Sequence, residues 1–167
     1  MNTVHIVEHY EGVPVNRTRL ADLVDGICRR FGADGATISV GIVDDREITD
    51  LNRRFLSHEN TTDCLSFDLS EGPARQDGGA FDLIVNGQMA AREAARRGHS
   101  SEAELALYVT HALLHQLGFG DATDDAAAKM HETEDEILQY FGYGPVYNGR
   151  ARRKGAASSD GGRDQEQ

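Results

Sequence analysis

The chain has 167 residues, enough for one domain with a substantial hydrophobic core but too few for two full-size domains. Its net charge of −11 argues against general nucleic-acid binding, so any RNA contact must be local and supported by a metal ion or a few arginines. No apolar run approaches the roughly 20 residues that span a bilayer, and the N-terminus lacks the basic and apolar segments of a secretory signal. We therefore expect a cytoplasmic protein without a membrane partner.

The first half of the chain predicts three strands and two helices. Apolar residues recur at helical spacing in residues 16–32 and 44–56, and the second segment opens with acidic residues that suit a helix N-terminus. Residues 36–43 alternate apolar and other side chains with the period of a strand. Residues 2–9 and 63–69 are also predicted to be strands.

The second half predicts one strand and three helices, over residues 81–87, 88–98, 101–117 and 123–142. Ser101 and Glu104 have the spacing of a capping box for the helix that ends at residue 117. Helices and strands in mixed order favour an α+β fold, a small mixed sheet of about four strands packed with about five helices.

The domain is expected to cover residues 1–147. Residues 148–167 are polar, rich in glycine and weakly basic, and they show no hydrophobic periodicity. This composition is typical of a disordered tail. The two cysteines, Cys28 and Cys64, lie far apart without CxxC spacing, which indicates reduced, buried thiols rather than a disulfide or a zinc knuckle.

The stretch VTHALLHQLGFGD, residues 109–121, carries two histidines four residues apart in an apolar helix. Four residues of an α-helix correspond to about 40° of rotation, so His111 and His115 project from one face. Imidazoles inside a buried helix are costly unless their nitrogens have partners. The pair alone fits two interpretations, ligands of one zinc ion or core histidines bonded to carbonyls or carboxylates.

The residues after the helix favour the metal. Gly118 can end the helix, and Gly120 allows a sharp turn that brings Asp121 to the same ion as a third ligand. Three protein ligands leave a fourth position for water, which is the layout of a catalytic zinc site, and zinc would lower the pKa of that water toward about 7. A metalloprotease is disfavoured, because Ala112 stands where the HExxH motif has its glutamate base.

The segment HALLHQLGFGD resembles the HGxLHLxGYDH signature of the YbeY family of zinc-dependent endoribonucleases. The segment LNRRFLSHENTTDCLSFDL is similar to the family's LNxxYRxxDxPTDVLSFP. The segment FDLIVNGQMAAREAARRGHSSEAELALYVTHALLH matches GDIxIxxExAxxQAxxxGHSxxxELxxLxxHGxLH without a gap. These matches cover residues 37–118, far more of the chain than the histidine pair.

The resemblance implies an activity and partners. It implies one Zn²⁺ per chain, with His111, His115 and Asp121 at the positions of the family's three histidines. Water on that zinc would attack a phosphodiester of single-stranded RNA. It also implies a role in maturing the 3′ end of the small-subunit ribosomal RNA and in ribosome biogenesis, with the small ribosomal subunit as partner.

One departure concerns the substrate side of the site. The family has an arginine where this chain has Leu56, and that arginine is expected to hold RNA phosphate. We expect Arg54 to take over as a catalytic residue, and we expect Arg53, His58 and Ser66 to bind substrate.

Other departures leave alternatives open. Gln88 and Gly120 replace acidic residues of the family pattern, which keeps open a non-enzymatic ribosome-associated factor with a degenerate metal site. A zinc hydrolase of a small molecule would instead have a closed pocket without a basic rim. His131 is an alternative third ligand, but its neighbours favour a solvated acidic face made of Glu132, Glu134, Asp135 and Glu136.

Overall fold

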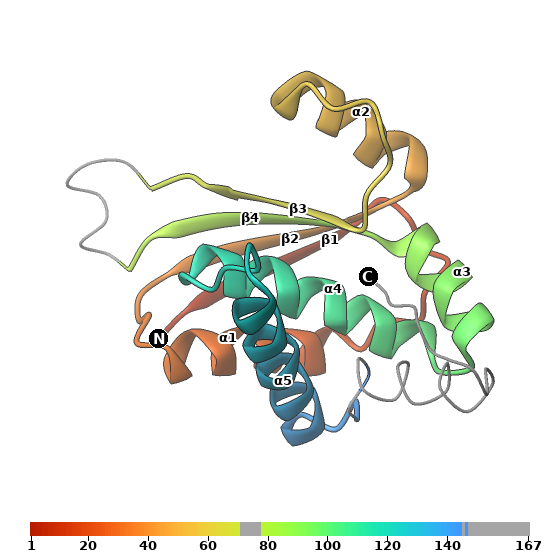
Figure 1. The fold of residues 1–167 in the computed structure, drawn as a ribbon. Helices are drawn as coiled ribbons and strands as arrows, with labels where there is room; N and C mark the ends of the chain where they lie inside the picture. Colours follow the sequence, from red (N-terminus) through yellow and green to blue (C-terminus); the bar gives the residue numbers. More distant parts are fainter. Residues whose placement is uncertain (71–77, 145, 147–167) are drawn as a thin grey trace.

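The computed structural model describes residues 1–70, 78–144 and 146, and this part of the chain forms four strands and five helices (Figure 1). The predicted α+β class and all nine predicted elements are confirmed. The predicted tail, residues 148–167, lies outside the described residues. The elements are β1 (Thr3–Glu8), α1 (Arg17–Arg30), β2 (Thr37–Val43), α2 (Asp45–Leu56), β3 (Cys64–Asp68), β4 (Ala80–Asn86), α3 (Gly87–Arg97), α4 (Ser101–Gln116) and α5 (Asp124–Tyr140).

The four strands form one mixed sheet in the order β1-β2-β4-β3. The pairs β1–β2 and β2–β4 are parallel, and β3 runs antiparallel to β4 at one edge. In the register of the sheet, Val40 of β2 lies between Ile6 of β1 and Leu83 of β4. Val40 and Leu83 are fully buried, as expected for inner strands covered on both faces.

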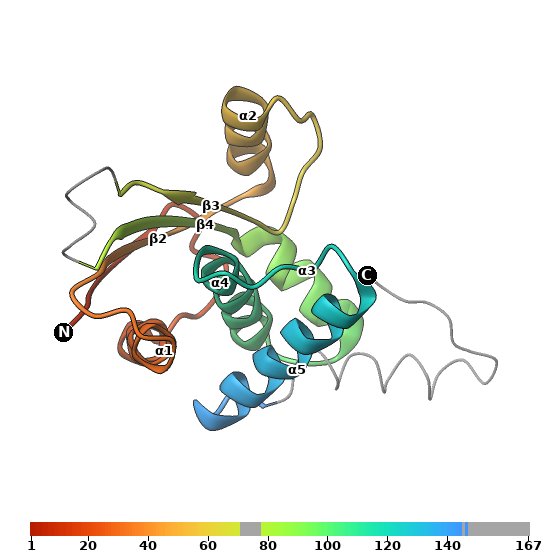
Figure 2. The same ribbon diagram turned by 60° about the vertical axis from the view of Figure 1, so that its left-hand side comes forward.

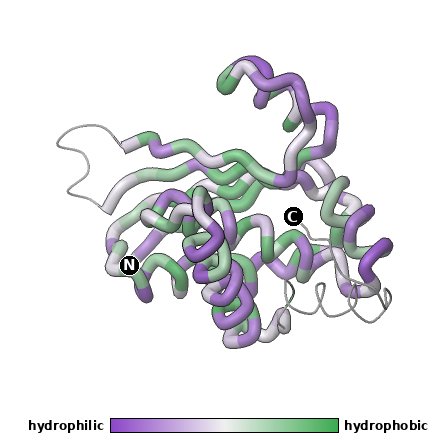
Figure 3. The backbone as a smooth tube through the Cα atoms, in the orientation of Figure 1, coloured by the Kyte–Doolittle hydropathy of each residue, from purple (hydrophilic) through white to green (hydrophobic). Residues whose placement is uncertain are grey.

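The helices cover the sheet unequally. Figures 1 and 2 both show α2 alone on one face and α1 with α4 on the other, while α5 packs on the far side of α4 and α3 lies beside it. In Figure 3 the strands and α4 are largely hydrophobic, whereas the outer helices α2, α3 and α5 show hydrophilic stretches. The helix α4 is therefore enclosed between the sheet and α5.

This enclosure explains the sequence of α4. Most of its residues are buried, among them Leu105, Val109, Leu113 and Leu114. A helix that is apolar around its whole circumference has no stable place at a surface, so it occupies the centre of the domain. This helix carries both histidines of the 109–121 stretch.

Both ends of α4 differ in detail from the sequence prediction. The N-cap is Ser100, whose side chain accepts a hydrogen bond from the backbone N–H of Ala103 at 3.0 Å, so the capping box at Ser101 is wrong. Glu104 is instead buried, where its carboxylate lies 2.6 Å from Nε2 of His99. At the other end Gly118 adopts a φ of +107°, which ends the helix. Gly120 is not in the left-handed region, so the turn predicted at Gly120 lies at Gly118.

Among the described residues, no helix has the length and the apolarity that a membrane crossing requires.

The two cysteines are free thiols, and their surroundings make them unreactive. Burial, assisted by the charge of Asp25, raises the pKa of the Cys28 thiol to about 11. Burial and the neighbouring Asp63 also raise the pKa of Cys64. The reactive thiolate is therefore scarce at pH 8.

We predict slow reaction of both thiols with Ellman's reagent in the native protein at pH 8 and rapid reaction after denaturation. A thiol that reacts rapidly in the native protein would contradict this prediction.

Candidate metal centre

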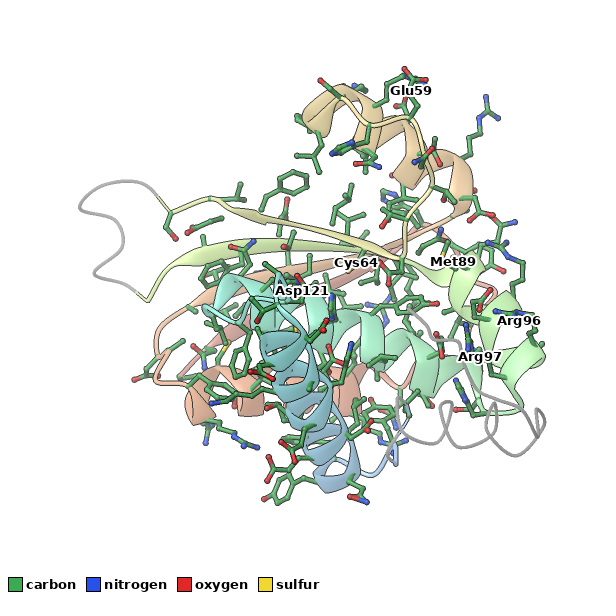
Figure 4. All side chains as sticks on the ribbon, in the orientation of Figure 1. Glu59, Cys64, Met89, Arg96, Arg97 and Asp121 are labelled. Atoms are coloured by element: carbon green, nitrogen blue, oxygen red, sulfur yellow. The ribbon has the colours of Figure 1, made fainter. Side chains whose placement is uncertain are left out.

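Three predicted ligands come together at the C-terminal end of α4. His111 and His115 lie one turn apart on the helix, and their Nε2 atoms are 3.1 Å apart. The segment between α4 and α5 returns Asp121 to this face (Figure 4), with its Oδ2 atom 3.5 Å from Nε2 of His115. One ligand atom from each residue lies within 4.8 Å of the others, which is the spacing that shared coordination of one ion requires.

Hydrogen bonds to the other ring nitrogens set the orientation of both imidazoles. Nδ1 of His115 lies 3.1 Å from the carbonyl oxygen of Phe119, which can only accept, so this nitrogen donates. Nδ1 of His111 lies 2.6 Å from Oε2 of Glu134, to which it donates. In the neutral rings both protons are then on Nδ1, and both Nε2 lone pairs point at one another.

Two facing lone pairs 3.1 Å apart repel each other unless a cation lies between them. A proton or a metal ion can fill that place, and the carboxylate of Asp121 adds a third donor beside it. Imidazole and carboxylate suit zinc and several other divalent transition metals. The residues present therefore fit a metal ion, and the carboxylate of Asp121 beside the two facing nitrogens favours a metal over a shared proton.

Glu134 is the unexpected member of the site. Its carboxylate is 1% exposed and lies between two histidines, with Oε2 on His111 and Oε1 3.0 Å from Nδ1 of His131. The rings of His111 and His131 are nearly parallel, with centroids 6.5 Å apart. Histidines that bind a metal commonly donate their second nitrogen to a carboxylate, which fixes the ring orientation.

The predicted solvated acidic face on α5 is therefore wrong for two of its members. Glu134 and Asp135 are buried, whereas Glu132 and Glu136 are exposed. Glu134 lies four residues after the buried Met130 and four before the buried Leu138, so it belongs to the apolar side of α5 that packs on α4. That spacing is a signal in the sequence, but the surrounding run of charged residues obscured it.

Burial and pairing have opposite effects on the two partners. Burial raises the pKa of Glu134, but the hydrogen bonds from His111 and His131 outweigh it and leave that pKa below its ordinary value. Burial likewise lowers the pKa of His111, but the hydrogen bond and charge of Glu134 outweigh it and raise that pKa. The carboxylate of Glu134 therefore stays ionised.

The residues predicted to bind substrate are dispersed. Ser66 of β3 contacts the helix that carries the histidines. Its hydroxyl accepts a hydrogen bond at 2.8 Å from Nε2 of Gln116, the residue that follows His115. His58 is exposed beyond the end of α2. The structure links Ser66, but not His58, to the helix that carries the histidines.

Arg53 and Arg54 lie near the end of α2, which Figures 1 and 2 place across the sheet from α4. Both guanidinium groups contact the carboxylate of Asp50 on their own helix. Leu56, at the position of the family's arginine, is 45% exposed. The structure does not bring these residues to the metal cluster.

Gln88 has a structural contact. Its Oε1 accepts a hydrogen bond from the backbone N–H of Asp45 at 3.0 Å, which satisfies one of the free donors at the N-terminus of α2. This substitution for the family's acidic residue therefore serves the packing of α2 against α3.

Beside the metal cluster is a cavity of about 450 Å³ that the sequence did not predict. His111, Asp121 and Glu134 line one part of it, and Glu93 and Arg97 of α3 line another. Basic residues at the end of a surface helix usually only complement its dipole, so no local pattern marks Arg97.

The contact between Glu134 and His111 predicts a measurable effect on metal affinity. Replacing Glu134→Gln removes the charge that orients His111, so zinc affinity should fall about 10- to 100-fold. Competitive titration with a chromogenic chelator measures it. Glu132→Gln, on the exposed side of the same helix, is the control and should bind zinc like the unmodified chain. Equal affinities of the two variants, with both folded in thermal unfolding, would contradict the orienting role.

Comparison with known proteins identifies the family of the chain. The model of the family described as "Endoribonuclease YbeY" matches residues 6–142. The protein of that name from Thermobifida fusca is 34% identical over 139 residues, covering 79% of this chain and 90% of the relative. The one from Anaeromyxobacter dehalogenans is 34% identical over 152 residues, covering 90% and 77%.

A solved structure supports the fold. The solution structure of TM1509 from Thermotoga maritima superposes with a TM-score of 0.56 at 22% identity, over 97% of this chain and 100% of that one. Because the family model spans nearly the whole sheet, both histidines and all of α5, the chain belongs to the YbeY family.

Proposed function

We propose that this protein is a zinc-dependent endoribonuclease that cleaves single-stranded RNA, with one ion per chain held by His111, His115 and Asp121. The observation that carries the proposal is the pair of facing Nε2 atoms beside a carboxylate, which needs a cation and fits a metal. The relatives in Thermobifida fusca and Anaeromyxobacter dehalogenans, which match most of this chain, are named endoribonucleases.

The three ligands differ in exposure, and this favours a catalytic site over a structural one. The side chain of His111 is 23% exposed, that of His115 is 33% exposed, and that of Asp121 is 49% exposed. Asp121 is the most exposed of the three ligands, so water and a phosphodiester would have access to an ion held by these groups. Bound zinc lowers the pKa of its water toward about 7 and polarises a phosphoryl oxygen, which is the chemistry that hydrolysis of RNA requires.

The chain's own residues hold this site in place. His115 is fixed by the carbonyl of Phe119, and His111 by Glu134, so neither ring can turn its Nε2 atom away. Asp121 is negative where the family has a neutral imidazole, so the bound water should be less acidic than in a site of three histidines. The pH at which activity appears should therefore be higher than in a site of three histidines.

We further propose ribosomal RNA as the substrate, with the small ribosomal subunit as partner, in the cytoplasm. Family membership supports this. The net charge of −11 repels RNA at long range, so a partner that presents the RNA strand would help recognition. Leu56 favours a second candidate, a ribosome-associated factor without nuclease activity, because the resemblance places a phosphate-binding arginine of the family at this position.

Metal content tests the ligand set. The purified protein should contain about one zinc per chain, and added zinc should raise its melting temperature, because the ion binds the folded form. Asp121→Ala should weaken zinc binding at least tenfold, and Asp121→His should retain it, because both side chains serve in tetrahedral sites. His131→Ala should leave the stoichiometry unchanged. The opposite pattern, with zinc lost from His131→Ala and kept in Asp121→Ala, would make His131 the third ligand.

Cleavage tests the activity. The zinc-loaded protein should cut a fluorescently labelled single-stranded RNA and leave a duplex of the same sequence and casein intact. His115→Ala should abolish cleavage, since it removes a ligand, whereas His5→Ala should cut at a rate within about twofold of the unmodified chain because His5 is exposed on the edge strand β1. A zinc-loaded protein that binds RNA without cutting it would favour the non-enzymatic candidate.

A further inference from the structure

The cavity next to the metal cluster joins three structural elements. It has a volume of about 450 Å³, which lies in the range of small-molecule binding sites. Its wall includes His111 on α4 and Asp121 from the segment that follows, then Leu107 and Tyr108 about one turn earlier on α4, then Met89 and Arg97 on α3. Whatever enters it therefore touches the metal residues and α3 at once.

The middle of the cavity wall is apolar and aromatic. Met89, Leu107 and Tyr108 contribute side chains without a formal charge, and Tyr108 stays protonated because burial and the nearby Glu104 raise its pKa. Apolar and aromatic surfaces of this kind suit the flat face of a nucleobase or a ribose ring. The cavity wall thus combines the metal residues, these uncharged side chains and the charged residues Glu93 and Arg97 of α3.

Arg97 is the one lysine or arginine among the described residues that line this cavity. Its side chain is 15% exposed, whereas that of Arg96, the next residue on the helix, is 61% exposed. Figure 4 labels both residues on α3, together with Met89. The two arginines thus offer a natural pair, one lining the cavity and one in solvent.

The contacts of Arg97 leave it able to bind an anion. Nε and one terminal nitrogen both contact the same oxygen of Glu93, at 3.1 and 3.0 Å. A guanidinium has five N–H donors, so donors remain for another ligand. Glu93 is also paired with Arg96. Two guanidinium groups share one carboxylate, so these three side chains together carry a net charge of +1.

The rest of the wall makes that charge important. Asp63, Asp121 and Glu134 also line the cavity, so it repels a phosphate group unless cations offset them. A bound metal ion supplies positive charge at one end, and Arg97 supplies it at the other. Arginine is well suited to this role, because its planar group contacts two phosphate oxygens together.

We propose that this cavity is the subsite for the nucleotide adjacent to the cleaved phosphodiester, and that Arg97 binds the next phosphate along the strand. The ribose or base of that nucleotide lies against Met89, Leu107 and Tyr108. This inference rests on the proposed function, since it assigns part of the same RNA strand. It makes Arg97 a substrate-binding residue that acts on affinity and not on the chemical step.

The test compares Arg97→Ala with Arg96→Ala. Both variants remove one guanidinium from Glu93 and one positive charge from α3, but only the first changes the cavity wall. Arg97→Ala should weaken binding of a labelled single-stranded oligoribonucleotide at least tenfold in fluorescence anisotropy, as loss of a charge-assisted hydrogen bond predicts. The slope of log K against log salt should become shallower by about 0.7, one phosphate contact on a single strand. KM should rise while kcat stays within about twofold.

Arg96→Ala should leave KM unchanged and move the binding constant by less than threefold. If Arg97→Ala has a clearly lower melting temperature than the unmodified chain, Arg97→Gln replaces it, because glutamine retains most of the side chain's length and packing. A short oligonucleotide is then prepared without its 5′ or without its 3′ terminal phosphate. One of these two losses should weaken binding to the unmodified chain, and neither should change binding to Arg97→Gln.

Equal binding constants and salt slopes for the Arg97 and Arg96 variants would overturn the subsite while leaving cleavage by the unmodified chain intact. A protein that never cleaves RNA would instead overturn the proposed function, and the anisotropy measurement would still decide whether Arg97 contacts RNA phosphate.

Discussion

The site depends on a buried carboxylate held between two histidines. An ionised carboxylate loses several kcal/mol of hydration when it leaves water, and only partners with good geometry offset that loss. Glu134 is 1% exposed, and its two oxygens face Nδ1 atoms of His111 and His131 at 2.6 and 3.0 Å. The contact with His111 links α5 to α4. One interaction therefore helps to position both α5 and the helix that carries the two histidine ligands.

The same rule governs the rest of α4. Thr110 is fully buried, and its hydroxyl donates to the carbonyl of Ala106 at 2.8 Å, while the buried Glu104 lies 2.6 Å from His99. These polar groups of the helix are satisfied inside the protein. Toward the C-terminal end the helix reaches the surface, and there His111 and His115 are partly exposed. A side chain on a packed helix is positioned more precisely than one on a loop, and a metal site requires such precision in the placement of its ligand atoms.

Local patterns in the sequence predict much of this arrangement. Strand and helix periodicities predict most of the nine elements, because an element that buries one face repeats its apolar residues accordingly, whereas the buried α4 shows as a long apolar run. The interval between His111 and His115 places both on one side of a helix, and the glycine at residue 118 returns the chain so that Asp121 reaches them. These relations span at most ten residues, over which backbone geometry is determined largely by residue type.

What local patterns do not predict is pairing between distant segments. Glu134 lies 23 residues from His111, and the charged neighbours of Glu134 on α5 resemble a solvated surface until α5 is packed on α4. Arg97 follows another arginine at the end of a helix, and only the position of α3 beside α4 brings Arg97 to the cavity. The catalytic role of Arg54 stays a prediction, and the structure places this residue near the end of α2, across the sheet from α4.

The charge distribution suggests how an acidic chain can act on RNA. Many arginines outside the site already face a carboxylate, including Arg17 with Glu8, Arg30 with Glu136 and Arg92 with Asp45. Such pairs contribute little field at a distance, so the surface offers weak attraction to a phosphate backbone. The positive potential that RNA needs must then arise locally, from a metal ion at the end of α4 and from the two arginines that share Glu93. Under the proposed function, metal loading therefore governs the binding of RNA as well as its cleavage, because the same ion that polarises the phosphodiester also offsets the carboxylates around it.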